Sequence, residues 1–132
     1  MCLDNIKQGL DNKPYNSTSI RWKVVEDVNG IIESQYTPTR YQLNVKKKSR
    51  RSKRFKYDDV ENIGFHVLIS KADAIRASKC NYYNKKWLIM KVEVEGFKRA
   101  GKWAGYNSET WKYLTPIAIF SKDGKRNISN KY

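Results

Sequence analysis

The sequence predicts an α+β fold: a small, mostly antiparallel β-sheet of five or six strands with one short helix and a basic loop. Three observations predict it. Short apolar runs with a two-residue period recur along the chain. Asn29-Gly30 stands between two of these runs, which is the strongest short signal for a hairpin. One helix start is recognisable at Ser70. The 132 residues are enough for a single domain, 1–132.

The first half of the chain predicts three strands. Residues 1–19 form a polar, irregular N-terminal segment, and alternating apolar residues then predict a strand over 20–28. A type I′ turn at Asn29-Gly30 leads into a second strand, which ends before Pro38. The alternation of Tyr41, Leu43 and Val45 predicts a third strand that leads directly into the basic loop 46–56.

The second half predicts the helix and the remaining strands. The apolar run 65–69 predicts a buried strand. Ser70 as N-cap and Asp73 in the first turn predict a helix to about Cys80. The next segments are an amphipathic strand, a glycine-rich turn region, a last strand that Pro116 marks as an edge strand or a bulge, and a polar basic tail: 87–95, 96–105, 111–120 and 121–132. Leu88, Met90, Val92 and Val94 share one face of the amphipathic strand.

The positive charge is concentrated in two segments. The formal net charge is +14, and residues 46–56 carry eight basic residues and no acidic one. Residues 97–132 carry eight basic and two acidic residues, while the rest of the chain is balanced. A mobile run of cations neutralises phosphates and releases their counterions, so a nucleic acid is the predicted partner. The alternatives are a solvated basic loop or a nuclear-import signal.

The predicted binding residues combine these cations with aromatic side chains that stand among basic residues, because such aromatics stack on unpaired bases. For the aromatic residues, the alternative is a place in the core of the sheet. The predicted nucleic-acid-binding set is Lys46, Lys47, Lys48, Arg50, Arg51, Lys53, Arg54, Lys56, Tyr82, Tyr83, Lys85, Lys86, Lys98, Arg99, Lys102 and Trp103. RNA is favoured over DNA because no helix-turn-helix, basic zipper or zinc-finger pattern occurs, although the aromatic motif of RNA-recognition domains is missing too.

Catalysis has weak support in the sequence. No CxxC, HExxH or P-loop pattern occurs, so we expect no catalytic centre, metal or cofactor. The alternative is a small nuclease or transferase that uses the single histidine, His66, with an acidic residue in one cleft: Glu61, Glu93 or Glu109. Loss of Met1 would make Cys2 an N-terminal nucleophile, but no basic partner for its thiol is identifiable. A third interpretation is a module whose basic loop docks on an acidic protein surface.

The sequence also predicts where the protein resides. No apolar run approaches the roughly 20 residues of a membrane span. The N-terminus lacks the charged and apolar regions of a signal peptide. Two cysteines, Cys2 and Cys80, are too few for a disulfide framework, so a cytoplasmic location is expected.

Several short motifs resemble small phage and mobile-element proteins: Met1-Cys2-Leu3, Trp22-Lys23-Val24-Val25, Gly64-Phe65-His66, Ala72-Asp73-Ala74 and Met90-Lys91-Val92. Small phage proteins are often counter-defence factors. Together with the charge, the resemblance implies an anti-CRISPR inhibitor that engages the guide RNA (crRNA) or the RNA-binding surface of an effector in the host bacterium. The type VI-B anti-CRISPR proteins, which act on Cas13b, are one such group.

Overall fold

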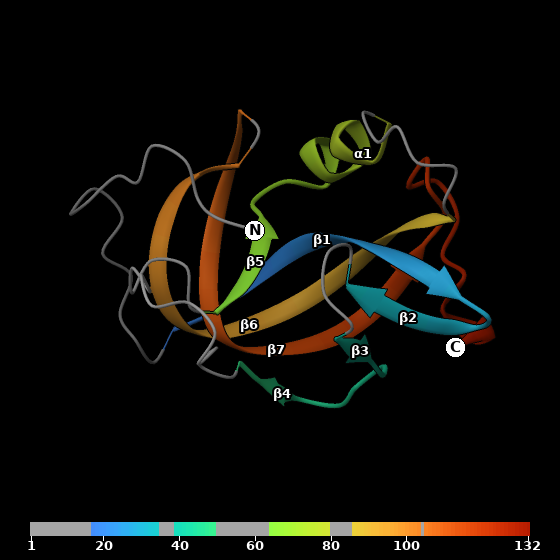
Figure 1. Cartoon of the computed structure of the whole chain (residues 1–132), viewed down its shortest axis with the longest axis horizontal. Helices are drawn as coiled ribbons and strands as arrows, with labels where there is room; N and C mark the ends of the chain where they lie inside the picture. Colours follow the sequence, from blue (N-terminus) through green and yellow to red (C-terminus); the bar gives the residue numbers. More distant parts are fainter. Residues whose placement is uncertain (1–16, 35–38, 50–63, 80–85, 104) are drawn as a thin grey trace.

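The computed structural model describes residues 17–34, 39–49, 64–79, 86–103 and 105–132, apart from the Trp103 side chain. These residues form a seven-stranded antiparallel sheet with one α-helix (Figure 1), so the predicted α+β class is confirmed and the strand count is higher than expected. The elements are β1 (Thr18–Val28), β2 (Ile31–Ser34), β3 (Arg40–Tyr41), β4 (Lys47–Lys48), β5 (Phe65–Leu68), α1 (Lys71–Lys79), β6 (Trp87–Trp103), β7 (Tyr106–Phe120) and the 3₁₀ turn η2 (Ser129–Lys131).

The predicted hairpin is confirmed. Val28 pairs with Ile31, so β1 and β2 are joined by a two-residue loop. Asn29 and Gly30 both have positive φ, 54° and 85°, as a type I′ turn requires. The Gly30 amide also donates to the Asp27 carboxylate over 2.8 Å, which fixes the turn.

β6 and β7 form one long hairpin, and here the expected turn region is wrong while one of the two interpretations of Pro116 is confirmed. The region 96–105 is not a turn: β6 continues to Trp103, with Gly96 at a φ of 75°. Its register against β7 shifts between Phe97 and Arg99, so the glycine-rich stretch bends the strand without ending it. A second shift between Lys91 and Val92 lies opposite Pro116, which confirms the predicted bulge. β7 is not an edge strand, because it pairs on both sides.

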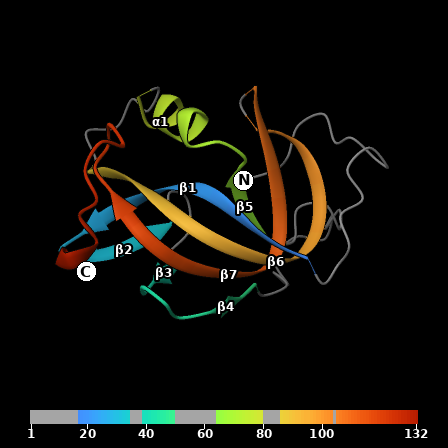
Figure 2. The same cartoon turned by 180° about the vertical axis from the view of Figure 1, so that it is seen from behind.

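The strand pairs close into a ring. β1 pairs with β6 along one edge and, at Trp22 opposite Leu68, with β5 along the other. β7 pairs with β6 on one edge and with β5 and β4 on the other. The sheet is therefore a small barrel, and its long strands β6 and β7 curve strongly around it (Figures 1 and 2).

Two apolar clusters stabilise the barrel. Adjacent residues of a strand point to opposite faces, so Val25 and Met90 belong to the barrel interior while Val24 and Ile89 lie on the outer face. The interior cluster also contains Ile32, Tyr41, Phe65, Val67, Leu88, Val92, Val94, Trp111, Leu114 and Ile119. The outer cluster is covered by α1 through Ala74 and Ala77.

The helix begins as the sequence predicts. The Ser70 hydroxyl accepts a hydrogen bond from the Asp73 amide over 3.1 Å, so Ser70 caps the first turn. Lys71 places its ammonium 4.1 Å from the Phe120 ring centre and 5.3 Å from that of Trp22. These contacts fix α1 on the barrel, on the side away from β3 and β4 (Figure 1).

Residues 39–49, which we call the strap, cross from β2 to β7. The predicted third strand over 41–45 is wrong: only Arg40–Tyr41 pairs with β2, and the chain then turns at Asn44, whose φ is 62°. The Asn44 amide donates to the Pro116 carbonyl over 2.8 Å, and Lys47 and Lys48 then pair with β7 as β4. The first residues of the basic run are thus an ordered strand of the barrel.

The predicted tail, 121–132, is also folded. Phe120 bridges to Asn127, and the Ser129 hydroxyl accepts a hydrogen bond from the Ile119 amide over 2.9 Å. Ile128 and Tyr132 pack against the interior cluster. Within the described ranges, no helix has the length and apolarity to cross a membrane.

Candidate nucleic-acid interface

The strap encloses a hollow of about 1380 Å³ against the barrel. Because the strap is bonded to β2 at one end and to β7 at the other, it lies across the barrel wall. The hollow is lined by Gly30, Ile31, Ile32, Arg40, Tyr41, Gln42, Leu43, Val45, Lys46, Lys47, Lys48, Ser49, Met90, Lys98, Lys112, Pro116, Ile119 and Tyr132. We call this site the strap hollow.

Among the residues that the structure describes, six cations line the strap hollow, and none of these lining residues is an aspartate or a glutamate. Lys46, Lys47, Lys48 and Lys98 belong to the set predicted from the sequence. Arg40 and Lys112 were not predicted, because neither belongs to a run of basic residues in the sequence. Strand pairing brings both of them to this surface. Like charges this close together favour binding of an anion with several charges.

Two of the cations form exposed ion pairs at the edge of the hollow. Arg40 Nε lies 3.2 Å from a Glu33 carboxylate oxygen, and Lys46 Nζ lies 2.7 Å from Glu95. The hydrogen bond with Glu95 raises the pKa of Lys46. The side chains of Arg40 and Lys46 are 68% and 53% exposed, and ion pairs in water are weak. A phosphate can therefore replace either carboxylate at little cost.

The Lys47 side chain bonds within the strap. Its ammonium donates to the Arg40 carbonyl over 2.9 Å, so this lysine connects β4 to β3. Lys46 and Lys112 also lie over the ring of Tyr113, at 4.8 Å and 5.5 Å from its centre. These contacts hold the cations beside the hollow before any ligand binds.

Other predicted site residues lie elsewhere. Lys86 pairs with Asp27 over 3.3 Å, and Arg99 and Lys102 belong to β6 but do not line the hollow. The remainder lie outside the described residues: Arg50, Arg51, Lys53, Arg54, Lys56, Tyr82, Tyr83, Lys85 and the Trp103 side chain. The predicted base-stacking role of these aromatic residues therefore stays a prediction.

His66 lies on the outer face of β5, opposite Thr110 of β7. Burial, together with the positive charge of Lys23, lowers the pKa of His66 to about 3, so its imidazole is neutral at physiological pH. The Lys23 ammonium, buried inside the barrel, donates to the His66 carbonyl over 2.7 Å. A histidine with this pKa is a poor general base near neutrality.

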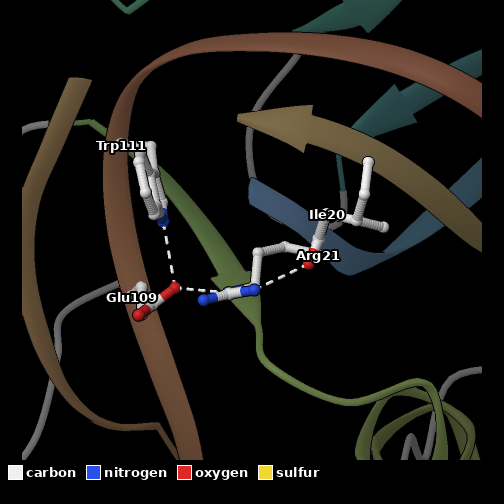
Figure 3. Close-up of polar contacts among 4 residues, drawn as sticks. All are labelled: Ile20, Arg21, Glu109 and Trp111. Carbon is white, nitrogen blue, oxygen red and sulfur yellow. Dashed lines mark hydrogen bonds and ion pairs between the residues drawn. The ribbon is translucent and has the colours of Figure 1, made fainter. Parts of the chain in front are cut away.

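Glu109, one of the acidic residues considered as a partner of His66, points into the barrel. It neighbours Thr110 on β7, so its side chain lies on the opposite face from His66. One Glu109 oxygen lies 2.5 Å from Arg21 Nε and accepts a bond from the Trp111 indole over 3.1 Å (Figure 3). His66 and Glu109 therefore do not share a cleft. Glu93 is exposed on β6, and Glu61 lies outside the described residues.

No protein-family model, curated protein or solved structure matches this chain. In the ranges given above, no three histidine, cysteine or acidic side chains gather as metal ligands would. The strap hollow is thus the feature of the described structure with the clearest chemical preference, and that preference is for anions.

Proposed function

We propose that the protein binds RNA through the strap hollow. The observation that supports this function is the lining of the hollow, in which the described residues include six cations and no aspartate or glutamate. Four of the cations come from the strap, which includes β3 and β4, and the other two come from β6 and β7. An extended anion can therefore contact several of them at once. Binding would release the counterions of the phosphates, which is the main source of affinity for nucleic acids.

RNA is favoured over DNA by the shape of the molecule. Helix α1 packs on the barrel through Ala74 and Ala77, on the side away from the strap (Figures 1 and 2), so it does not present itself to a major groove beside the cations. Sheet surfaces and hollows bordered by cations are typical of proteins that bind unpaired RNA.

The test is the salt dependence of RNA binding. Fluorescence anisotropy with a labelled single-stranded RNA gives the association constant over a series of salt concentrations. If the hollow engages about four phosphates, the logarithm of that constant falls against the logarithm of salt with a slope of about −3. Replacing Lys48, Lys98 and Lys112 by Gln should reduce the slope by about two, because each lost phosphate contact contributes about 0.7.

The matched control removes the same charge elsewhere. Lys79, Lys122 and Lys125 are exposed and do not line the hollow, so their replacement by Gln should change the slope little. Thermal melts of both triple variants check that the fold is intact. A salt-independent parent protein, or two variants with equal effects, would contradict the proposal.

The expected partner, the crRNA of a Cas13b-type effector, is a specific case of this proposal. It predicts that the protein inhibits target-RNA cleavage by the effector, and that the Lys48, Lys98 and Lys112 variant inhibits less. Unchanged cleavage at saturating protein would exclude this partner while leaving RNA binding to the test above.

A further inference from the structure

The strap hollow contains exposed apolar side chains between its cations. Ile31 and Val45 are 41% and 48% exposed, which is high for residues of this size. Leu43 and Pro116 line the same surface, and Leu43 packs against the interior cluster. The buried side chains of Ile32, Tyr41, Met90 and Ile119 form its inner wall. The hollow thus has apolar side chains on its inner wall and cations around its edge.

Tyr132 adds a fixed aromatic ring to this lining. Its hydroxyl donates to an Asp27 oxygen over 2.5 Å, and Lys86 contacts that same oxygen over 3.3 Å. These contacts outweigh the effect of burial and hold the pKa of Asp27 below its usual value. The ring is half-buried and borders the hollow at the end where Gly30 lies.

A nucleic-acid duplex leaves such a surface unused. It presents phosphates and sugars outward and keeps its bases stacked inside, so it satisfies cations but covers little apolar surface. An unpaired strand exposes the faces of its bases, which bind apolar and aromatic side chains in water. The volume of about 1380 Å³ also exceeds the roughly 300–1,000 Å³ of a small-molecule pocket, which suits a ligand of several units.

We infer that the strap hollow takes a single-stranded stretch of RNA, with bases on the apolar surface of Ile31, Leu43 and Val45 and phosphates on the cations around it. This inference rests on the proposed RNA binding and specifies its ligand. Unpaired bases contribute affinity that does not depend on salt, whereas the phosphates contribute the salt slope. The two contributions can therefore be measured separately.

The experiment compares three ligands with equal numbers of phosphates: a single-stranded RNA, the same RNA in a duplex, and a ribose-phosphate chain without bases. The single strand should bind at least about tenfold more tightly than either of the others. The double variant Ile31→Thr, Val45→Thr should lose about fivefold in affinity for the single strand and almost nothing for the chain without bases, with an unchanged salt slope. Threonine keeps the branched shape of both side chains, and both sites are exposed, so the fold is expected to tolerate the changes.

The control uses the other exposed isoleucines. Ile20 and Ile69 are 42% and 39% exposed and do not line the hollow, so Ile20→Thr, Ile69→Thr should bind all three ligands as the parent does. Equal binding of the single strand, the duplex and the base-free chain would overturn the inference and leave RNA binding intact. An equal loss in the two double variants would overturn it as well. Absence of binding to every ligand in dilute buffer would overturn the proposed function itself.

Discussion

Arg21 and Glu109 lie 88 positions apart in the sequence and form an ion pair inside the barrel, with 2.5 Å between Arg21 Nε and the Glu109 carboxylate (Figure 3). The side chain of Glu109 is 1% exposed and that of Arg21 is 15% exposed. The same Glu109 oxygen accepts the Trp111 indole N–H. One carboxylate oxygen therefore connects β1 to β7 and accepts hydrogen bonds from two side chains of the barrel interior.

Replacing this carboxylate should destabilise the barrel strongly. In Glu109→Gln, the guanidinium of Arg21 loses its counter-charge in a largely buried position, and we expect the free energy of unfolding to fall by about 2–4 kcal/mol. Urea denaturation followed by tryptophan fluorescence measures the loss. Glu93→Gln, an exposed change on β6, is the control and should stay within about 0.5 kcal/mol of the parent. Equal urea midpoints for the two variants would show that the Arg21–Glu109 pair makes no net contribution to the free energy of unfolding.

Lys23 makes the stability depend on pH. Burial lowers its pKa to about 8, from 10.5 for an exposed lysine. Between these two values the unfolded chain binds more protons than the folded protein, so the free energy of unfolding rises with pH. We expect a gain of at least about 1 kcal/mol between about pH 8 and about pH 9.5.

The pH range of that measurement is limited by tyrosine. Burial raises the pKa of Tyr132 to about 12, and burial also raises that of Tyr41, so both favour the unfolded state above about pH 10, where an unfolded tyrosine ionises. Urea midpoints below that pH isolate Lys23. Lys23→Met should flatten the profile, and a profile with the same rise in this variant would assign the effect to another group.

Gly64 should tolerate no side chain. Its φ is 131°, and a Cβ built on it would lie 2.9 Å from the Trp111 carbonyl oxygen, which belongs to the backbone of a paired strand and cannot move aside. Gly64→Ala therefore combines backbone strain with a steric clash, and we expect it to cost about 3 kcal/mol. Gly30 also has positive φ but has open space around it, so Gly30→Ala should cost only about 1 kcal/mol. Thermal melts of the two variants should fall in that order.

The sequence predicts correctly those turns and helix ends whose conformation depends only on neighbouring residues. Asn29-Gly30 fixes a turn by its own backbone preferences, and Ser70 caps the helix that follows it. The same reasoning failed at Gly96, because a glycine that bends a strand and a glycine that ends one look alike in a sequence. Closure of the barrel depends on pairs such as Trp22 with Leu68, which no local pattern reveals.

The candidate site was predictable only in part for the same reason. The run that begins at Lys46 was visible because its charges are consecutive. Arg40 and Lys112 are isolated in the sequence, and pairing of β3 with β2 and of β4 with β7 brings them to the strap hollow. Ile31 and Val45 gave no signal, because alternation of apolar residues predicts a buried face and says nothing about a ligand.

The last prediction separates the strap hollow from the rest of the basic run. Replacing Arg50, Arg51, Lys53 and Arg54 by Ser removes four cations that follow the hollow directly in the sequence. A cation that contacts only phosphates does not distinguish unpaired bases from paired ones. This variant should therefore have a smaller salt slope and an unchanged preference for single-stranded over duplex RNA. The Ile31→Thr, Val45→Thr variant should show the converse: a parental slope and a reduced preference. Anisotropy titrations of both variants against both RNAs at several salt concentrations measure the two quantities. If the quadruple variant loses the preference and the isoleucine–valine variant keeps it, the bases bind to the basic run and not to the barrel.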